Sequence, residues 1–415
     1  MERRATEMRV AYLNPSGQLG GAEISLLDFL ASLRAAEPDW SLHLMAGEEG
    51  PLIAKARAAG IQATVVPFPL PLARLGDAGV GGPSGAQISR IALAFKLAQA
   101  SAAVAIYSRR LRRALVQLAP DLIHTNGFKM HILGLRARPR RVPVIWHIHD
   151  YVSLRPVMMR LMRKYAGRCS AVVANSKSVA ADIQSVCAGR LRVHPVYNAV
   201  DLDRFSPTGA KLDLDKLSGL DAAEPGTVKV GLLATLGRWK GHTIFLKALS
   251  LLPSSFRFRG YVIGSAIYKT GGSQYQLDDL RRIADQLGIA GKVGFTNFVE
   301  EADAAMRALD IVVHASTEPE PFGLVIAEAM ACGRAVIVSQ GGGAAEIINV
   351  GVDALGHTPG DASELAERIK QLAIDPALRV RLGQAARAAA EQRFNRARLA
   401  KELIPIYREA RKARN

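Results

Sequence analysis

The sequence of 415 residues is poor in cysteine and lacks long apolar runs. Its three cysteines, Cys169, Cys187 and Cys332, are odd in number and far apart, so they predict neither a disulfide framework nor a zinc site, and they fit a reducing compartment. No apolar stretch of about 18 residues or more lacks a charge, so we expect no membrane-spanning helix. The longest candidate, residues 91–107, contains Lys96. The charged first residues precede no apolar segment, so we also expect no signal peptide.

Acidic residues are scarce in the first half of the chain. Residues 1–198 contain 26 Lys and Arg against 12 Asp and Glu, whereas residues 199–415 contain 28 against 25. Between Arg90 and Arg168 the only acidic residues are Asp121 and Asp150. The first half is therefore expected to face an anionic partner, and the second half need not. The overall composition, with 49% hydrophobic and 22% charged residues, is that of a globular protein and excludes a mostly disordered chain.

Short apolar runs alternate with helical patterns along the chain. Strands are expected at 8–13, 41–46, 63–66, 121–124, 142–147 and 171–174, and, after a turn-rich break at 197–207, at 228–233, 260–263, 293–295, 311–314 and 335–338. Such alternation predicts parallel sheets joined by right-handed crossovers. The predicted fold is α/β, with two Rossmann-like doubly wound domains, 1–198 and 199–395, facing a central cleft where ligands bind at the strand ends. The glycine-rich stretch 75–85 is expected to form a loop.

Three glycine-rich or basic loops follow predicted strands. Gly20 and Gly21 precede a helix, where glycines permit close approach of the backbone and free N–H groups attract an anion. Arg238 and Lys240 follow the first strand of the second half, where they could neutralise a diphosphate. The segment 339–346 contains three more glycines before a helix. An ordinary strand-to-helix turn and a pair of solvated surface cations remain the alternatives.

Two glutamates in the second half stand eight positions apart. The segment reads Glu318-Pro-Glu-Pro-Phe-Gly-Leu-Val-Ile-Ala-Glu-Ala-Met330, which puts Glu320 just before a predicted helix and Glu328 about two turns inside it. Two carboxylates near one helix start suit hydrogen bonds to sugar and ribose hydroxyls. A capping glutamate and a solvated glutamate would give the same pattern.

These motifs together resemble the retaining GT-B glycosyltransferases of family four, also called glycosyltransferase group 1. The resemblance covers nearly the whole chain. Its most specific elements are the Glu320–Glu328 segment with Pro-Phe-Gly inside it and the segment Asn198-Ala-Val-Asp-Leu-Asp-Arg-Phe205. Gly20-Gly21-Ala22-Glu23, Asn175-Ser176 and Trp239-Lys240-Gly241 add to it, in the expected order.

The resemblance implies roles for particular residues. The second domain would bind a nucleotide-diphosphate sugar, linked to UDP or GDP, and the first domain the acceptor. Lys240, with Arg238, would bind the diphosphate, Glu320 the donor sugar and Glu328 the ribose, without a cofactor or a divalent metal. The helix at 396–415 would pack back on the first domain. The donor would also lie along the backbone of Phe322, Gly323 and Leu324, and near Gly20 and Gly21.

Two positions depart from the family pattern. The family usually has an arginine five residues before the lysine, where this chain has Thr235, and Arg238 is the candidate to replace it. The family also has an acceptor-side histidine where this chain has Asn126, in His124-Thr-Asn126. Asn126 can orient a hydroxyl but cannot take its proton. His147 and His149 come one strand later and could border the cleft, and we name Asn126 and His149 as catalytic candidates beside Lys240 and Glu320.

The basic first half also carries two predicted amphipathic helices, at 108–118 and 151–168, which combine Arg and Lys with Leu and Met. Such helices suit an anionic membrane surface, although core stripes with solvated basic faces would look the same. Few aromatic residues interleave the cations, so nucleic acid is not expected.

We therefore expect a retaining, metal-independent hexosyltransferase of cell-envelope polysaccharide or lipopolysaccharide synthesis. It would be cytoplasmic and peripheral on the inner face of the membrane, with a glycan or a polyprenyl-linked lipid as acceptor. A nucleotide-sugar epimerase or hydrolase and a non-catalytic sugar-binding homologue are the alternatives.

Overall fold

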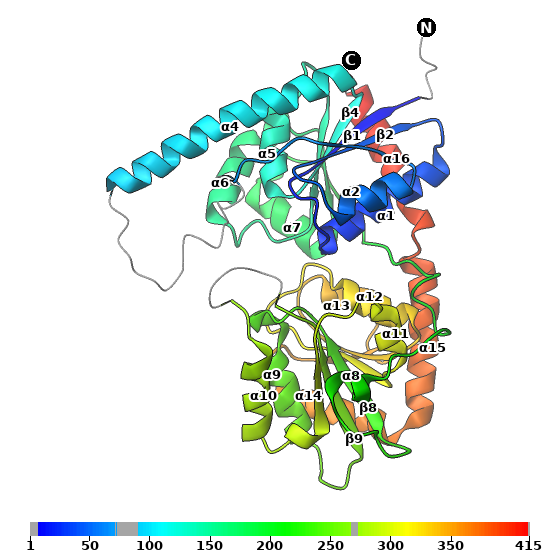
Figure 1. Cartoon of the computed structure of the whole chain (residues 1–415). Helices are drawn as coiled ribbons and strands as arrows, with labels where there is room; N and C mark the ends of the chain where they lie inside the picture. Colours follow the sequence, from blue (N-terminus) through cyan, green and yellow to red (C-terminus); the bar gives the residue numbers. More distant parts are fainter. Residues whose placement is uncertain (1–6, 71, 73–89, 267–272, 414–415) are drawn as a thin grey trace. The chain divides into compact units, whose positions relative to one another are not determined.

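The computed structural model describes residues 7–70, 72, 90–266 and 273–413, and the expected loop at 75–85 lies outside these residues (Figure 1). The chain divides into two compact units. Unit 1 comprises Met1–Asn198 and Arg396–Asn415, and unit 2 comprises Ala199–Asn395. Each unit contains one parallel sheet between layers of helices, as the alternation of apolar runs and helical patterns predicts. The α/β class and the two Rossmann-like domains are thus confirmed.

Unit 1 contains a seven-stranded sheet in the order β3-β2-β1-β4-β5-β6-β7. Every strand pair is parallel, and β1 lies between β2 and β4 because the chain crosses over after β3. The strands are β1 (Arg9–Asn14), β2 (Ser41–Ala46), β3 (Gln62–Val65), β4 (Leu122–Asn126), β5 (Val144–Ile148), β6 (Ala171–Ala174) and β7 (Val193–Pro195). The interior strands β1, β4, β5 and β6 are nearly continuous buried runs, as parallel strands covered on both faces require, whereas the edge strands β3 and β7 are partly exposed.

Helices cover both faces of this sheet. α1 (Gly21–Ala36), α2 (Pro51–Ala58) and the last helix, α16 (Ala397–Lys412), lie on one face (Figure 1). The other face holds α4 (Arg90–Leu118), α5 (Phe128–Ala137), α6 (Pro156–Tyr165) and α7 (Lys177–Val186), with one continuous apolar core beneath them. Two contacts fix α16 on α1: Arg396 Nε pairs with Asp28 Oδ1 at 2.8 Å, and Ala400 N donates to Ser32 Oγ at 3.0 Å.

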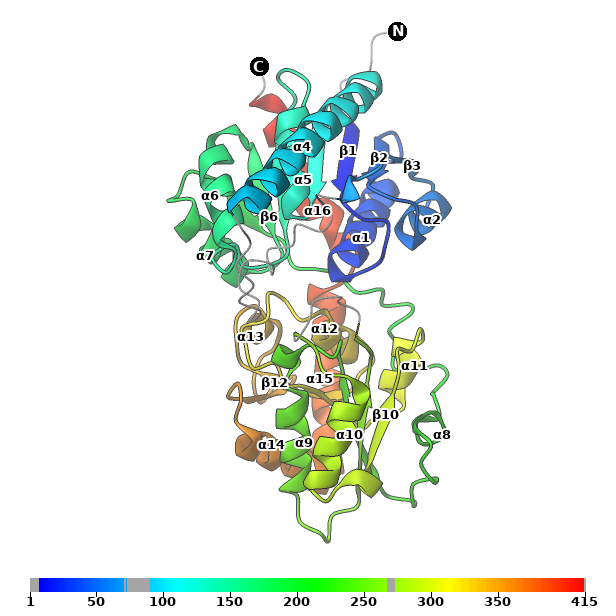
Figure 2. The ribbon, with the colours of Figure 1, turned by 60° about the vertical axis from the view of Figure 1, so that its left-hand side comes forward.

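Unit 2 contains a six-stranded parallel sheet in the order β10-β9-β8-β11-β12-β13. The strands are β8 (Val228–Leu233), β9 (Phe258–Ile263), β10 (Val293–Thr296), β11 (Ile311–His314), β12 (Ala335–Ser339) and β13 (Leu355–His357). α9 (His242–Ser250), α10 (Leu277–Gln286) and α14 (Ala362–Ile374) cover one face, and α11 (Ala302–Arg307), α12 (Leu324–Ala331) and α15 (Pro376–Arg393) the other (Figure 2). The short helices α8 (Leu214–Ser218) and α13 (Ala344–Ile347) complete the unit.

Buried hydrogen bonds tie the segment that opens unit 2 to α11. Arg307 in α11 is 4% exposed, pairs with Asp303 at 2.5 Å, and donates to the main-chain oxygens of Arg204, Ser206 and Ala210. The end of unit 2 pairs with its beginning, since Val200 N donates to Phe394 O at 2.8 Å. The backbone between Val200 and Ala210 is therefore held in place by residues from other parts of unit 2.

The helix expected at 151–168 begins later than predicted. α6 starts at Pro156, because proline suits the first helical turn and Arg155 before it is engaged by Asp150. Met158 and Met162, which we expected on an amphipathic surface, are buried in the core, whereas Leu154 and Val157 are exposed. The helix expected at 108–118 is the last part of α4. Among the helices that the structure describes, none has the length and hydrophobicity needed to span a lipid bilayer.

Candidate active site

The chemistry-bearing residues of unit 2 gather at the carboxyl ends of β8 and β11. Lys240 follows β8 in a short 3₁₀ turn, Arg238–Lys240, and Glu320 follows β11. Lys240 Nζ donates to both carboxylate oxygens of Glu320, at 2.7 and 2.8 Å. Both side chains are largely buried, with 21% and 14% of their surface exposed. The structure therefore brings together two residues that stand 80 positions apart in the sequence.

The surroundings of Glu320 keep it ionised. Burial alone would raise the pKa of this carboxyl, but Lys240 and His314 outweigh burial and lower the pKa below its usual value. Ser316 Oγ also donates to Glu320 Oε2, at 2.9 Å. The backbone of Glu320 pairs with the glycine-rich loop 341–343, because Glu320 N donates to Gly341 O and Gly343 N donates to Glu320 O. The segment that contains Glu320 and the glycine-rich loop 341–343 thus lie side by side, next to the pair of Lys240 and Glu320.

Gly241 allows the chain to turn from this site into α9. Its φ of +74° lies in the left-handed region, and a Cβ atom there would lie 1.8 Å from the main-chain oxygen of Ala315. We expect Gly241→Ala to lower the free energy of unfolding by about 3 kcal/mol, because the change adds backbone strain and forces two loops apart. Urea unfolding followed by tryptophan fluorescence measures this loss.

Gly351→Ala is the matched control for that experiment. Gly351 has a similar φ, +79°, but no atom lies within 4 Å of its added Cβ. Only the backbone cost of about 1 kcal/mol should remain. Equal losses in the two variants would contradict a role for the contact between Gly241 and Ala315.

Arg238, the candidate for a second cation at the diphosphate, lies in the same 3₁₀ turn as Lys240. Its guanidinium lies over the ring of Tyr275, 4.4 Å from the centroid, and the side chain is exposed. Thr235, where the family has an arginine, is partly buried, and its hydroxyl has no hydrogen-bond partner among the residues that the structure describes. His242, the first residue of α9, is fully buried, and burial lowers its pKa to about 4. Arg238 therefore remains a candidate for the diphosphate through its position at the strand end.

The residues expected along the donor lie at the start of α12. Gly323 is its N-cap with φ +89°, and Leu324 is its first residue. Phe322 is buried against Phe394, with ring centroids 6.0 Å apart. Glu328 lies in the second turn of α12 and is half-buried. The first turn leaves backbone N–H groups free of helical hydrogen bonds, the arrangement that attracts a phosphate or another anion.

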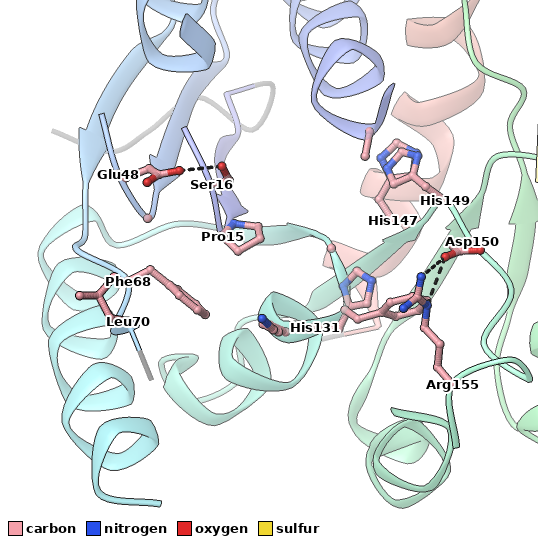
Figure 3. Close-up of a pocket in the computed structure, with 15 residues that line it drawn as sticks. Pro15, Ser16, Glu48, Phe68, Leu70, His131, His147, His149, Asp150 and Arg155 are labelled. Atoms are coloured by element: carbon pink, nitrogen blue, oxygen red, sulfur yellow. Dashed lines mark hydrogen bonds and ion pairs between the residues drawn. The ribbon is translucent and has the colours of Figure 1, made fainter. Parts of the chain in front are cut away.

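Unit 1 contains a separate cavity of about 550 Å³ at the carboxyl ends of β1, β4 and β5 (Figure 3). Among the described residues that line it, two acids, Glu48 and Asp150, offset two bases, Lys129 and Arg155. Arg155 pairs with Asp150, and Ser16 Oγ donates to Glu48 Oε1 at 2.8 Å (Figure 3). The remainder of the wall consists of apolar groups and three histidines: Pro15, Ala22, Gly47, Phe68, Leu70, Gly127, Phe128, His131, His147 and His149.

The two catalytic candidates of unit 1 are hydrogen-bonded to each other. His149 Nε2 lies 2.6 Å from Asn126 Oδ1, and Asn126 Nδ2 donates to Asn14 Oδ1 at 2.8 Å. His149 lines the cavity, whereas Asn126 is fully buried behind it. Asn126 is thus placed to orient His149, and His149 is placed to touch a ligand. Burial lowers the pKa of His149 to about 3, so that its ring is neutral near pH 7.

His124, His147, Gly20 and Gly21 pack against other residues of unit 1. His124 is fully buried and accepts or donates one hydrogen bond with Tyr407 of α16, at 2.6 Å. His147 is fully buried, stacks on Phe29 with ring centroids 4.4 Å apart, and is among the residues that line the cavity. Gly20 caps α1 and Gly21 begins it, next to Ala22 in the cavity wall. Gly20 and Gly21 thus lie in unit 1, beside a residue of the cavity wall, and neither is among the residues that line the cavity.

Sequence reasoning missed four polar residues of these sites, which are Asn14, His131, His314 and Ser316. Each lies at or just after the carboxyl end of a parallel strand, or on the helix that follows it. A polar residue at the end of a strand is a signal that the sequence contains. To use this signal one must also know the order of the strands, since β1 and β4 are neighbours in the sheet but far apart in the sequence. Within the described ranges, no group of three or more His, Cys, Asp or Glu side chains could hold a metal ion.

Several solved structures resemble this chain in fold and, more weakly, in sequence. HepE of Anabaena in complex with UDP has 26% identity, a TM-score of 0.75, and coverage of 96% of this chain and 99% of its own. Its complex with UDP-glucose has 25% identity and a TM-score of 0.74, with coverage of 96% and 98%. Sucrose-phosphate synthase of Thermosynechococcus elongatus, at 20% identity, shares the fold with a TM-score of 0.74 over 98% of this chain and 100% of its own. The two Rossmann-like domains thus define a GT-B glycosyltransferase.

Sequence comparisons give the family. The family model described as Glycosyltransferase Family 4 matches residues 19–204, and the model described as Glycosyl transferases group 1 matches residues 222–389. A D-inositol 3-phosphate glycosyltransferase of Xylanimonas cellulosilytica is 31% identical over 71% of this chain and 73% of its own length. The protein of that name from Mycobacterium bovis is 28% identical over 70% of this chain and 62% of its own length. The chain belongs to the family-four glycosyltransferases of group 1, as the motifs predict.

Proposed function

We propose that this glycosyltransferase moves a sugar from a UDP-linked donor, bound in unit 2, to a hydroxyl of an acceptor bound in the cavity of unit 1. The observation that carries the proposal is the buried pair of Lys240 and Glu320 at the strand ends of unit 2. The complexes of HepE with UDP and UDP-glucose support UDP over GDP. An epimerase or a hydrolase would need no acceptor cavity such as the one in unit 1.

Lys240 would stabilise the departing diphosphate. Glycosyl transfer passes through an oxocarbenium-like state while negative charge grows on the leaving group. The ammonium of Lys240, the guanidinium of Arg238 and the N-terminal ends of α9 and α12 supply positive potential for that charge. We infer that these groups suffice without a divalent metal. Glu320 holds Lys240 in place until the donor arrives and would then contact the sugar.

The acceptor side fits retention of configuration by attack on the face that the diphosphate leaves. In that mechanism the departing phosphate takes the acceptor proton. Asn126 has no basic atom, and the low pKa of His149 makes it a weak base. His149 would therefore orient the acceptor hydroxyl and leave the proton to the phosphate.

The experiment is a thermal-shift screen of UDP, GDP, ADP and their sugars, followed by NMR of the anomeric configuration of the product. Stabilisation by UDP and UDP-glucose, unchanged by EDTA, together with an α-linked product from the α-linked donor, is the expected result. An inverted product would overturn retention, and activity that needs an added metal would overturn metal independence. Release of a free or epimerised sugar with no transfer product would favour the hydrolase or epimerase instead.

We further propose that the acceptor is a glycan or a lipid-linked glycan of the cell envelope, reached at the cytoplasmic face of an anionic membrane. The arginines at the end of α4 (Arg109, Arg110, Arg112 and Arg113) and the basic side chains of α6 are exposed, and so are the apolar Val157 of α6 and Leu154 just before it. Cations around exposed apolar side chains attract anionic lipid and insert weakly into it. These side chains support peripheral attachment of the protein to the membrane through unit 1.

A double variant tests that attachment. Arg160→Gln with Lys164→Gln removes two exposed charges from α6, each worth about 1 kcal/mol near an anionic surface. We expect binding to phosphatidylglycerol vesicles to fall about 30-fold, with no binding of either protein to phosphatidylcholine vesicles. Lys247→Gln with Arg257→Gln, two exposed residues of unit 2, is the control that should bind as the wild type does. Equal vesicle binding by all three proteins would argue against α6 as the contact.

A further inference from the structure

A buried histidine lies beside the carboxylate of Glu320. It is His314, the last residue of β11, whose side chain is 5% exposed. Its Nε2 lies 3.6 Å from Glu320 Oε2, just beyond the length of a hydrogen bond. Both ring nitrogens are buried and have no hydrogen-bond partner in the described part of the chain. Because an unmade buried hydrogen bond costs free energy, this position favours a second state in which the imidazole pairs with the carboxylate.

Lys240 is the cation that pairs with Glu320 in the structure. Its Nζ donates to both carboxylate oxygens, at 2.7 and 2.8 Å, so the two charges cancel. A neutral ion pair attracts a proton to the neighbouring imidazole only weakly, and burial opposes the charged form of a histidine. While Lys240 and Glu320 are paired, His314 therefore gains little from a proton.

A bound diphosphate would change this balance. Its negative charges compete with Glu320 for the ammonium of Lys240. The carboxylate cannot follow the lysine far, because the backbone of Glu320 is hydrogen-bonded to the loop 341–343. A largely buried carboxylate that loses its cation needs another cation or a proton. Ser316 Oγ donates to Glu320 Oε2 but brings no charge, whereas His314 can bring one.

We propose that His314 takes up a proton when a nucleotide-diphosphate sugar binds, and that the imidazolium replaces Lys240 as the partner of Glu320 while Lys240 turns to the diphosphate. The proton comes from the solvent, and no bond between heavier atoms changes. It resides on the imidazole because an imidazole is a stronger base than a carboxylate. His314 is thus a positioning residue that acts on the donor through Glu320. The inference rests on the proposed function in taking Lys240 as the ligand of the diphosphate.

Donor binding and protonation of His314 would then strengthen each other. The donor-bound state holds one proton more than the free state, so affinity for the donor rises as the pH falls and weakens as the pH rises. For a histidine, we expect UDP-glucose to bind about tenfold more weakly at about pH 8 than at about pH 6. In His314→Gln this pH dependence should be absent.

Two further histidines near this pair are the rival sites for the proton. His357 of β13 is fully buried, with Nε2 3.2 Å from the main-chain oxygen of His314 and Nδ1 2.9 Å from that of Thr358. His242 is the first residue of α9, directly after the turn that contains Lys240. The N-terminal end of a helix disfavours a cation, and neither histidine has a described contact with the carboxylate of Glu320. Both are therefore tested alongside His314.

Calorimetry of the full chain with UDP-glucose, without acceptor, in HEPES and in Tris buffer measures proton uptake from the difference between the two binding enthalpies. UDP-glucose is the probe because its diphosphate is capped by the sugar and has no terminal phosphate that titrates at about pH 6. At about pH 7.5 the wild type should take up about one proton per molecule bound, and His314→Gln none. Ser316→Ala removes another hydrogen bond to the same carboxylate oxygen and should keep the uptake. His194→Gln, at a partly buried histidine of β7 in unit 1, is the matched control and should equal the wild type.

NMR spectra of the chain labelled with ¹⁵N-histidine identify the residue that gains the proton, with assignments from His314→Gln, His242→Gln and His357→Gln. An imidazolium signal of His314 that appears with UDP-glucose is the expected result, and it decides the question even if His314→Gln fails to fold. Uptake by His242 or His357, or binding without uptake, overturns the inference. If that binding is lost in Lys240→Ala, the proposed function stands without it. Binding that survives Lys240→Ala removes the proposed role of Lys240 and this inference together.

Discussion

Lys240→Ala is expected to lower kcat/KM for the UDP-sugar by a factor of about 10² to 10³, because it removes a positive charge aimed at the departing diphosphate. The same change leaves the largely buried carboxylate of Glu320 without its cation. The pKa of Glu320, which Lys240 helps to lower, should rise as a result. Steady-state kinetics with UDP-glucose and an acceptor, together with UDP affinity by calorimetry, measure the effect.

A double-mutant cycle separates two effects of Lys240→Ala: the loss of the positive charge at the diphosphate, and the loss of the cation that pairs with Glu320. If Lys240 acts on the diphosphate, Lys240→Ala with Glu320→Gln should regain stability relative to Lys240→Ala without regaining its rate. His149→Ala should lose much less rate than Lys240→Ala, since His149 orients the acceptor and carries no charge. Lys247→Ala, an exposed lysine of α9, is the charge-matched control and should behave as the wild type does. Wild-type activity in Lys240→Ala would remove Lys240 from the mechanism.

Arg307→Ala should give the largest loss of stability in unit 2, about 3 to 5 kcal/mol, because it strands Asp303 and three main-chain oxygens in a buried place. Denaturant unfolding of the whole chain, resolved into its transitions, measures this. Arg204→Ala is the matched control, since Arg204 pairs with the same Asp303 but is 48% exposed, and it should cost at most about 1 kcal/mol. Similar losses in both variants would contradict the role of burial.

The free energy of unfolding at low pH provides a second test of the role of Arg307. Burial raises the pKa of Asp303, but Arg307 and Arg204 outweigh burial and lower it below 3.8. A lowered carboxyl pKa contributes stability at pH values above the unfolded pKa, and that stability is lost as the pH falls through the folded pKa. The wild type should therefore lose stability more steeply than Arg307→Ala as the pH falls below 3.8.

The interior strands could be predicted from the sequence because strands buried on both faces are short apolar runs, and 41–46, 171–174, 228–233 and 311–314 match the structure to the residue. The edge strands β7 and β13 could not, since each has three residues and no apolar run of its own. The sequence also does not show which side chains of α6 are buried. Spacing gives one apolar stripe, but only the packing shows that Met158 and Met162 face the core while Val157 faces solvent.

The candidate site could be predicted in part. Lys240 and Glu320 were named separately, each from its own motif, and the structure shows that they form one ion pair. Asn126 and His149 were also named as separate catalytic candidates, whereas the structure joins them with Asn14 in a single chain of hydrogen bonds. Such pairings depend on the order of strands in the sheet, which the order of motifs along the sequence does not contain.

The chain leaves unit 1 after Asn198 and returns to it at Arg396, and the two junctions lie close together. Val200 pairs with Asn395 on the unit 2 side, and Arg398 Nη2 donates to the main-chain oxygen of Asn198, at 2.7 Å, on the unit 1 side. Residues 199–395 are therefore inserted into the other unit as a module with adjacent ends, the arrangement in which insertions are best tolerated. One in-frame replacement could exchange this module between relatives. Such a chimaera would separate the specificity carried by the module from that carried by the cavity of unit 1.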